Sequence, residues 1–348
     1  MKIKLIAFTG FFAILLAMIG CTKQEALTIQ KPYTYDAQYY ANLRAYKKTN
    51  HNLCFGWYAD YRNGAGYLDP ASWGLRILGL PDSMDIVSLW SGLPGNDSSK
   101  HDSYGPVAYA DMHFVRENKG TRFVAPTIVR MDHVITLKDG SQYDLAANHT
   151  DAGIEVYAKY LVDMVLDADI DGVDLDYEPA GDWLQGANFT KLVQFIGATF
   201  GPKGSKPEKL LIIDFYSTVP PVATGEYANY FIRQAYSQGT GGVQNATNLQ
   251  SYYNAVQTAV PPGKFIVTEN LGDFAENGGT PFTEANGNTL TAEGTIMYSL
   301  EGMARWNPTQ GKKAGYGGFY FNRDYYSKTG VPYYNIRRAI QIANPAAK

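Results

Sequence analysis

Two kinds of hydrophobic pattern alternate along this chain. Short runs that are apolar throughout or at every second position are typical of strands, whereas longer runs with apolar residues three and four positions apart are typical of helices. The two patterns form about eight successive strand–helix units. This number and order predict an α/β protein built as a single (β/α)8 barrel, in which reactive groups lie at the carboxyl ends of the strands. We predict strands at 52–58, 84–90, 122–130, 171–178, 209–216, 230–236, 264–269 and 315–321, and helices at 36–48, 107–117, 151–166, 188–200, 248–260, 292–305 and 333–342.

Two segments depart from this regular alternation. The strands at 209–216 and 230–236 follow each other with little room for a full helix between them. The segment 131–144 contains Asp139-Gly140 between two short alternating runs, which predicts a hairpin. This hairpin is a candidate wall of the cleft.

The stretch 171–178, which reads Asp-Gly-Val-Asp-Leu-Asp-Tyr-Glu, carries the strongest chemical signal. Its apolar residues alternate with Asp174, Asp176 and Glu178, and successive side chains of a strand point to opposite faces. Three carboxylates therefore share one face, about 6.7 Å from neighbour to neighbour, where like charges repel by roughly 2.5 kcal/mol at an effective dielectric near 20. We expect one proton to be retained, so that Glu178 can serve as a general acid near neutral pH.

Two other readings of this region stay open. The stretch 167–178 fits the calcium-loop pattern D-x-D-x-D-G-x5-E of an EF-hand. Against it, Pro179 disfavours the helix that should leave the loop at Glu178, and Asp174 fills a loop position that is usually apolar. An acidic loop facing solvent is disfavoured because its residues interleave with β-branched and aromatic ones. The pattern therefore favours a catalytic strand over a calcium-loaded structural protein.

The same residues resemble a family signature. Asp171-x-x-Asp174-x-Asp176-x-Glu178, with Gly172 after the first acid, is similar to the motif of glycoside hydrolase family 18, the chitinases and endo-β-N-acetylglucosaminidases. The resemblance implies that this stretch is the fourth strand of a (β/α)8 barrel and that Glu178 is the catalytic acid. Asp171 and Gly172 would then be structural parts of the motif.

The resemblance extends to two further strand ends. Gln234-x-Tyr236 is similar to a Gln-x-Tyr on the sixth strand of family 18 endoglycosidases, whose side chains hold the substrate's N-acetyl group. Asn322 with Asp324 resembles the Tyr-Asn-Leu-Asp ending of the endoglycosidase H type, where most chitinases place a Trp at the position of Asn322, and Tyr320 of the same strand is a further candidate. These four candidate substrate-binding residues imply an endo-acting enzyme that cleaves GlcNAc-β-1,4-GlcNAc in N-glycans. A chitinase and a non-catalytic surface glycan-binding protein on the same fold are the alternatives.

The resemblance also implies a mechanism. An ordinary retaining glycosidase needs a second carboxylate about 5 Å away across the bond, whereas Asp176 lies on the same strand as the acid; family 18 uses the substrate's own acetamide instead. In that scheme Glu178 protonates the leaving oxygen and Asp176 orients the acetamide N–H. Asp174 shares a proton with Asp176, and Tyr236 fixes the acetamide carbonyl. No metal and no organic cofactor is expected.

The amino terminus predicts export. Lys2 and Lys4 precede an apolar run at 5–19 that is short for a membrane span and ends at a small residue before Cys21. Met18-Ile19-Gly20-Cys21 resembles a bacterial lipobox, which implies lipidation at Cys21; ordinary secretion is the alternative. The one remaining cysteine, Cys54, lies in an apolar context and is expected to be a buried core thiol.

These features define the domain organisation that we predict. Residues 1–20 are a lipoprotein signal peptide, 21–35 a tether and 36–348 the catalytic barrel. No Asp follows Cys21, so the inner-membrane retention signal of enteric bacteria is missing, and we expect a lipid-anchored protein of the bacterial cell envelope, at the outer membrane or cell surface.

Composition narrows the choice of partner. The net charge is −3 and there is no run of Lys or Arg, so nucleic acid would find no electrostatic footprint and is not an expected partner. The chain has 27 Tyr, and aromatic faces suit the apolar faces of sugars as well as they suit a core. N-glycans remain the expected substrate.

Overall fold

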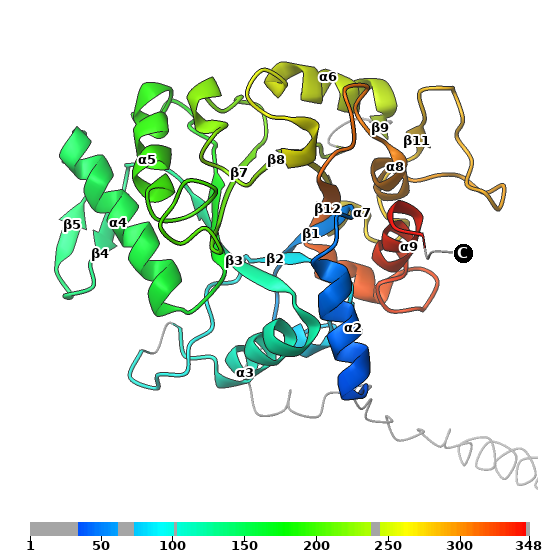
Figure 1. Cartoon of the computed structure of the whole chain (residues 1–348), viewed down its shortest axis with the longest axis horizontal. Helices are drawn as coiled ribbons and strands as arrows, with labels where there is room; N and C mark the ends of the chain where they lie inside the picture. Colours follow the sequence, from blue (N-terminus) through cyan, green and yellow to red (C-terminus); the bar gives the residue numbers. More distant parts are fainter. Residues whose placement is uncertain (1–33, 62–72, 101–102, 238–243, 346–348) are drawn as a thin grey trace, which may run out of the picture.

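A closed barrel of parallel strands forms the centre of the molecule (Figure 1). The computed structural model describes residues 34–61, 73–100, 103–237 and 244–345. The strands pair around the ring in the order β1-β12-β10-β8-β7-β6-β3-β2, which confirms the predicted (β/α)8 architecture. Their bounds are β1 (Leu53–Tyr58), β2 (Ile86–Leu89), β3 (Arg122–Ile128), β6 (Gly172–Asp176), β7 (Leu210–Phe215), β8 (Tyr230–Gln234), β10 (Phe265–Asn270) and β12 (Gly315–Phe319).

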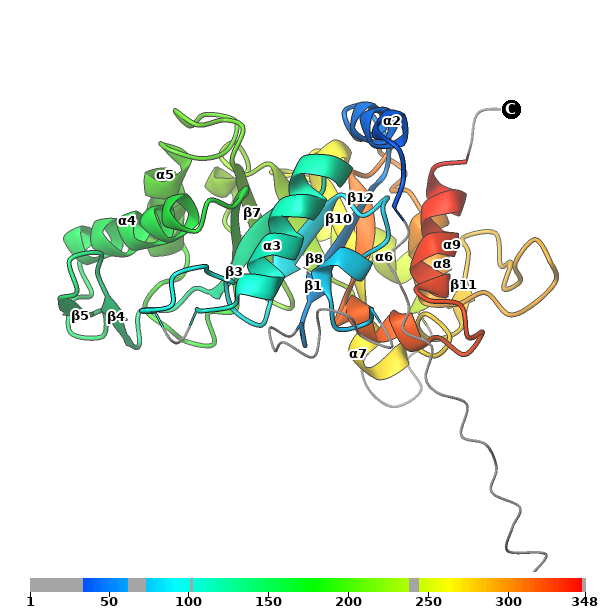
Figure 2. The same ribbon diagram turned by 90° about the horizontal axis from the view of Figure 1, so that it is seen from below.

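Helices surround the ring of strands (Figures 1 and 2). The long helix before β6 shows why they form: Thr150 caps its first turn by accepting a hydrogen bond from the Gly153 N–H, and one apolar face is buried against the strands. The helices are α2 (Ala37–Lys47), α3 (Pro106–Phe114), α4 (Asp151–Asp167), α5 (Ala187–Gly197), α6 (Ala246–Val256), α7 (Leu271–Phe274), α8 (Ser299–Arg305) and α9 (Tyr334–Ala343).

The alternation along β6 divides its side chains between two environments. Val173 and Leu175 belong to the large apolar core between the strands and the surrounding helices. Asp174 and Asp176 point the other way, into the barrel, where Asp174 bonds to Trp57 of the small inner cluster. The barrel therefore carries the acidic face of β6 inside, towards the carboxyl ends of the strands.

The irregular segments agree in part with the sequence. Only a short 3₁₀ turn at Val222–Thr224 separates β7 from β8, as their spacing predicts. The hairpin is present as β4 (Val134–Thr136) and β5 (Gln142–Asp144), with Gly140 in the left-handed region at φ 86°. Both views show it beside α4 at the edge of the molecule (Figures 1 and 2), so it does not border the barrel interior.

Several predicted element bounds are wrong, and the structure shows the cause for two of them. The predicted helix at 292–305 begins only at Ser299, because the residues before it form an antiparallel bridge between Leu290 and Ile296, with Gly294 at φ 79° in the turn. The last strand, predicted to reach residue 321, ends at Phe319. Tyr320 adopts a left-handed conformation at φ 50°, which turns the chain out of the strand.

The first two residues of the acidic motif fix the start of β6. Asp171 accepts a hydrogen bond from the Phe123 N–H on its side chain and one from the Leu210 N–H on its carbonyl oxygen, so it ties β6 to both neighbouring strands. Gly172 follows with φ 156°, and a Cβ there would lie 2.2 Å from the Leu210 carbonyl oxygen. Only glycine lets the two strands approach so closely.

The substitution Gly172→Ala is expected to lower the free energy of unfolding by about 3 kcal/mol, because the methyl group meets backbone that cannot move aside. Urea denaturation measures the change. Gly263→Ala is the matched control, since a Cβ at Gly263 meets nothing within 4 Å. Equal stability of the two variants would contradict the packing described here.

The amino-terminal predictions lie outside the described residues. These begin at residue 34, so the signal peptide, Cys21 and nearly all of the tether are not part of the structure described here. Asp36, where the predicted catalytic domain starts, caps α2 by accepting a hydrogen bond from the Tyr39 N–H. Within the described ranges, none of the helices has the length and apolar character needed to cross a membrane.

Candidate active site

Three aspartates lie together inside the carboxyl end of the barrel. Asp174 and Asp176 come from β6 and Asp214 from β7, where Asp176 and Asp214 are directly paired in register. Asp174 and Asp214 have no exposed surface, and Asp176 is 5% exposed. Carboxyl groups buried this deeply need hydrogen-bond donors or protons to compensate for lost water.

Two donors hold one oxygen of Asp174. The Trp57 Nε1–H donates to Oδ2 at 2.9 Å and the Ser88 hydroxyl donates to the same oxygen at 2.8 Å. Trp57 comes from β1 and Ser88 from β2, so the side chain of Asp174 is fixed by two strands that are not neighbours of β6 in the ring. These donors stabilise the ionised form of this carboxyl.

Gln234 bridges the other two aspartates. Its Nε2 donates to Asp214 Oδ1 at 2.6 Å and to Asp176 Oδ1 at 3.3 Å. The sequence indicates Gln234 as a contact for the substrate's N-acetyl group. The structure places its amide nitrogen against carboxyl groups at the barrel end, and a contact to substrate stays a prediction.

Burial and neighbouring charges raise the pKa values of the three aspartates. Burial raises the pKa of Asp174 to about 6. Burial, followed by the charge of Glu178, raises the pKa of Asp176 to about 7. Burial and the charges of Asp174 and Asp176 hold the pKa of Asp214 well above its ordinary value. The cluster therefore retains at least one proton at neutral pH.

Glu178 lies two residues beyond the end of β6. Its carbonyl oxygen accepts two hydrogen bonds from the Arg130 guanidinium, from Nε at 3.1 Å and Nη2 at 2.9 Å. The residue is partly exposed, unlike the three aspartates. Its charge contributes to the raised pKa values of both Asp176 and Tyr236, so its carboxyl lies close to them. Arg130 thus fixes the backbone of a partly exposed acid.

Tyr236 and aromatic rings border the same site. Burial, then the charges of Asp214, Asp176, Asp174 and Glu178, raise the pKa of Tyr236 well above its ordinary value, which keeps its hydroxyl a hydrogen-bond donor. The ring centroid of Tyr236 lies 5.9 Å from that of Phe319, at the end of β12. Phe319 also lies within 6.2 Å of Trp57 and 5.6 Å of Trp90. Phe319 is therefore the central ring of the aromatic group at this barrel end.

Asn322 and Tyr320 lie in the turn after β12. Asn322 is 3% exposed, and its Oδ1 accepts a hydrogen bond from the Ala59 N–H at 3.1 Å, which ties this turn to the end of β1. The Tyr320 ring packs edge-on against Phe319 at 4.7 Å, with the Arg323 guanidinium 4.9 Å from its centroid. The structure thus gives Asn322 a contact within the fold, and its contact to substrate stays a prediction.

A second carboxylate network fixes the backbone beside Tyr236. Glu269, at the end of β10, is fully buried and accepts hydrogen bonds from the N–H and the hydroxyl of Ser237, from the Asn270 N–H and from the Ser299 hydroxyl. Ser237 directly follows Tyr236, so Glu269 joins the end of β8 to α8. All four acceptor positions of this carboxylate are filled by donors.

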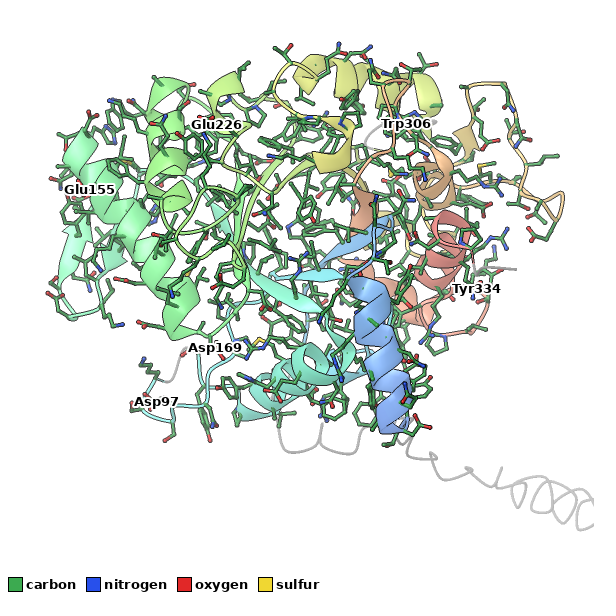
Figure 3. All side chains as sticks on the ribbon, viewed as in Figure 1. Asp97, Glu155, Asp169, Glu226, Trp306 and Tyr334 are labelled. Atoms are coloured by element: carbon green, nitrogen blue, oxygen red, sulfur yellow. The ribbon has the colours of Figure 1, made fainter. Side chains whose placement is uncertain are left out.

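The acidic residues of the calcium pattern point to separate partners. Asp167 bonds to Lys138 at 2.5 Å, and Asp169 bonds to Arg116 at 2.7 Å. Figure 3 shows Asp169 on the outside of the molecule, between α3 and α4. In the part of the chain that the structure describes, no group of three or more His, Cys, Asp or Glu side chains is arranged to hold a metal ion.

Sequence reasoning missed several residues of this site, namely Asp214, Trp57, Ser88, Arg130 and Phe319. Each lies at or near the carboxyl end of a barrel strand. Asp214 offered the clearest signal, because it is the only charged residue in the apolar run Leu-Leu-Ile-Ile-Asp-Phe at 210–215. A single acid at the end of a barrel strand is a catalytic candidate by position alone.

Comparison with protein families gives one match over nearly the whole chain. The model of glycoside hydrolase family 18, BT1044-like, matches residues 22–342. Among curated proteins, endo-β-N-acetylglucosaminidase F2 of Elizabethkingia meningoseptica is 25% identical over 334 residues, which cover 89% of this chain and 88% of that protein.

Solved structures support the same fold. A structure of BT1044 superimposes with a TM-score of 0.69 at 20% identity, covering 89% of this chain and 93% of that one. An endo-β-N-acetylglucosaminidase from Cordyceps militaris gives a TM-score of 0.62 at 19% identity, covering 92% of this chain and all of the other.

Proposed function

The chain belongs to glycoside hydrolase family 18, in its BT1044-like group, and is a glycoside hydrolase; we propose that it is an endo-β-N-acetylglucosaminidase that cleaves the GlcNAc-β-1,4-GlcNAc core of N-glycans. The observation that carries this proposal is the grouping of Asp174, Asp176, Glu178 and Tyr236 at one barrel end. This grouping joins a partly exposed acid to buried carboxyls and a tyrosine hydroxyl.

The arrangement supports substrate-assisted catalysis. The carboxyl whose raised pKa reflects the charge of Glu178, Asp176, comes from the same chain segment as the acid, and in this scheme no carboxylate takes the role of nucleophile. The oxygen of the substrate's 2-acetamido group attacks the anomeric carbon, and Glu178 gives its proton to the leaving oxygen. An oxazolinium forms, water opens it after Glu178 accepts a proton from that water, and the configuration is retained.

The neighbouring residues act on the acetamide group. Asp176 accepts a hydrogen bond from the acetamide N–H and offsets the positive charge of the oxazolinium. The Tyr236 hydroxyl donates to the acetamide oxygen and aligns it for attack. Asp174, held by Trp57 and Ser88, fixes Asp176 from behind through the buried cluster.

The relatives support the substrate class. A double mutant of the Cordyceps militaris enzyme was solved in complex with fucosyl-N-acetylglucosamine-Asn, the reducing-end unit that remains on a glycoprotein after such a cleavage. The fungal enzyme and endo-β-N-acetylglucosaminidase F2 share the name of the proposed activity. We infer that this chain leaves the same unit on its substrate.

Mass spectrometry of reaction products tests this function. High-mannose, hybrid and complex glycoproteins and chitin oligomers are incubated with the protein, and release of a glycan that ends in one GlcNAc is the expected result. Cleavage of chitin oligomers alone would make the protein a chitinase. Hydrolysis of plain glucosides would contradict the mechanism, because such substrates have no acetamide to attack the anomeric carbon.

We further propose that Cys21 carries a lipid and anchors the enzyme in the bacterial cell envelope. The apolar run before Cys21 and the lipobox-like Met18-Ile19-Gly20-Cys21 support this. An enzyme anchored there meets N-glycans outside the cytoplasm. Its net charge of −3 does not favour binding to nucleic acid.

Cys21→Ser is expected to move the protein from the membrane fraction to the soluble fraction without loss of specific activity, since lipidation needs the thiol. Fractionation of cells followed by immunoblotting measures the distribution. Cys54→Ser serves as the control, because Cys54 is a buried free thiol of the barrel. A Cys21→Ser variant that stays in the membrane fraction would exclude this anchor.

A further inference from the structure

Asp214 is a buried acid to which the mechanism above assigns no role. We propose that Asp214 is a positioning residue that stays protonated at neutral pH and donates its proton as a hydrogen bond to Asp174. The place of the proton follows from the geometry of the cluster. Its consequence for catalysis rests on the proposed function.

The four carboxyl oxygens of Asp174 and Asp214 differ in their hydrogen-bond partners. Asp174 Oδ2 accepts from Trp57 and Ser88, and Asp214 Oδ1 accepts from Gln234. The remaining oxygens, Asp174 Oδ1 and Asp214 Oδ2, are completely buried and receive no N–H or O–H donor among the described residues. The two carboxyl groups lie within hydrogen-bonding reach of each other. A single proton between them satisfies both oxygens.

The donors and charges around the two acids decide which of them holds that proton. Asp174 already has two donors on its other oxygen, which favour its ionised form. Asp214 has one neutral amide donor and faces two carboxyl groups of β6. Two unit charges about 4 Å apart repel by roughly 4 kcal/mol at an effective dielectric near 20. The proton therefore belongs on Asp214, which is neutral between the two charged neighbours.

A neutral Asp214 has a direct effect on Asp176. The groups that face Asp214 are Asp174 and Asp176 from β6, Gln234 and Tyr236 from β8, and Glu178 beyond β6 through its effect on Asp176. An ionised Asp214 would add a negative charge beside Asp176 and oppose its ionisation. A protonated Asp214 adds none, since its one O–H is donated to Asp174. Asp176 can then ionise and accept a hydrogen bond from the acetamide N–H of the substrate.

Two substitutions at Asp214 separate this role from a carboxylate role. Asp214→Asn keeps the acceptor for Gln234 and places an N–H donor where the O–H stood, so kcat should stay within about threefold of wild type. Asp214→Leu has a similar branched shape without donor or acceptor, and kcat should fall at least about tenfold while KM changes less. An Asn variant that loses as much activity as the Leu variant would overturn the proposal.

The pH dependence of kcat/KM adds a readout that packing alone would not change. In Asp214→Leu the O–H donor that keeps Asp174 ionised is lost, so the pair Asp174–Asp176 should hold a proton up to higher pH and the acidic limb of the profile should move to higher pH. In Asp214→Asn this limb should stay near that of wild type. A profile that is the same in all three proteins would contradict a role that acts through Asp176.

Infrared spectroscopy tests the proton without any substrate. The difference spectrum of wild type minus Asp214→Asn at neutral pH should contain a carbonyl band of a neutral carboxylic acid that shifts in heavy water. A carboxylate band in its place would overturn the assignment even if both proteins are active. Because this measurement needs no turnover, it stands even if the protein fails to cleave N-glycans.

Discussion

Glu178→Gln is expected to lower kcat by about 10²–10⁴-fold, the usual contribution of a general acid, while glycan binding changes little. The amide has nearly the shape of the acid but has no proton to give to the leaving oxygen. Arg130 holds Glu178 through its backbone carbonyl, so the substitution leaves the position of the loop unchanged. Product release is measured by chromatography, and binding by calorimetry with the intact glycopeptide.

Glu226→Gln is the matched control for this experiment. Glu226 is an exposed glutamate that pairs with Lys203 and precedes the amino end of β8, and Figure 3 shows it near α5. This control should keep full activity. If Glu178→Gln kept activity within a few-fold of the control, another residue would be the acid.

Asp176→Asn is the second large effect, with a loss in kcat of about 10²-fold or more. The amide cannot carry the charge that offsets the oxazolinium. Its NH₂ group also cannot accept the hydrogen bond that the acetamide N–H donates to Asp176. This result contrasts with the near-normal activity expected of Asp214→Asn, although the two aspartates are paired in adjacent strands. The same amide thus has opposite effects at two neighbouring positions.

Steady-state kinetics with the same glycopeptide measures this effect, and Asp169→Asn, on the outer surface, is the control for loss of a carboxylate. A further check is a substrate whose leaving group needs little protonation. Asp176→Asn should stay slow on it because its defect lies in the attack step, whereas Glu178→Gln should recover part of its rate. Recovery by both variants to the same degree would contradict the separate roles proposed for them.

The sequence predicted the half of the site that depends on local pattern. A period of two placed Asp174 and Asp176 on one face of β6, and the structure places that face inside the barrel. Gln234 and Tyr236 were likewise found from alternation and from their resemblance to known strand ends. Such signals lie within a single strand, so they need no knowledge of which strands are neighbours.

The other half depends on contacts between strands that are distant in sequence. Asp214 meets Asp176 only through the register of β7 on β6, and Trp57 reaches Asp174 across the barrel from β1. Neither contact has a local pattern. The contact of Asn322 within the fold is also nonlocal, since one left-handed residue, Tyr320, turns the chain and brings Asn322 to a backbone N–H of the β1 end. A single φ angle of this kind is not encoded by hydrophobic periodicity.

The hydrogen bonds around Glu269 have a consequence for how this enzyme can diverge. Ser237 donates two hydrogen bonds to the Glu269 carboxylate of β10, which also fixes the backbone of the neighbouring Tyr236. The long segment between β10 and α8 ends at Ser299, whose hydroxyl donates a hydrogen bond to the same carboxylate. Insertions or deletions within that segment can therefore change its length without moving Tyr236, on which the proposed mechanism depends.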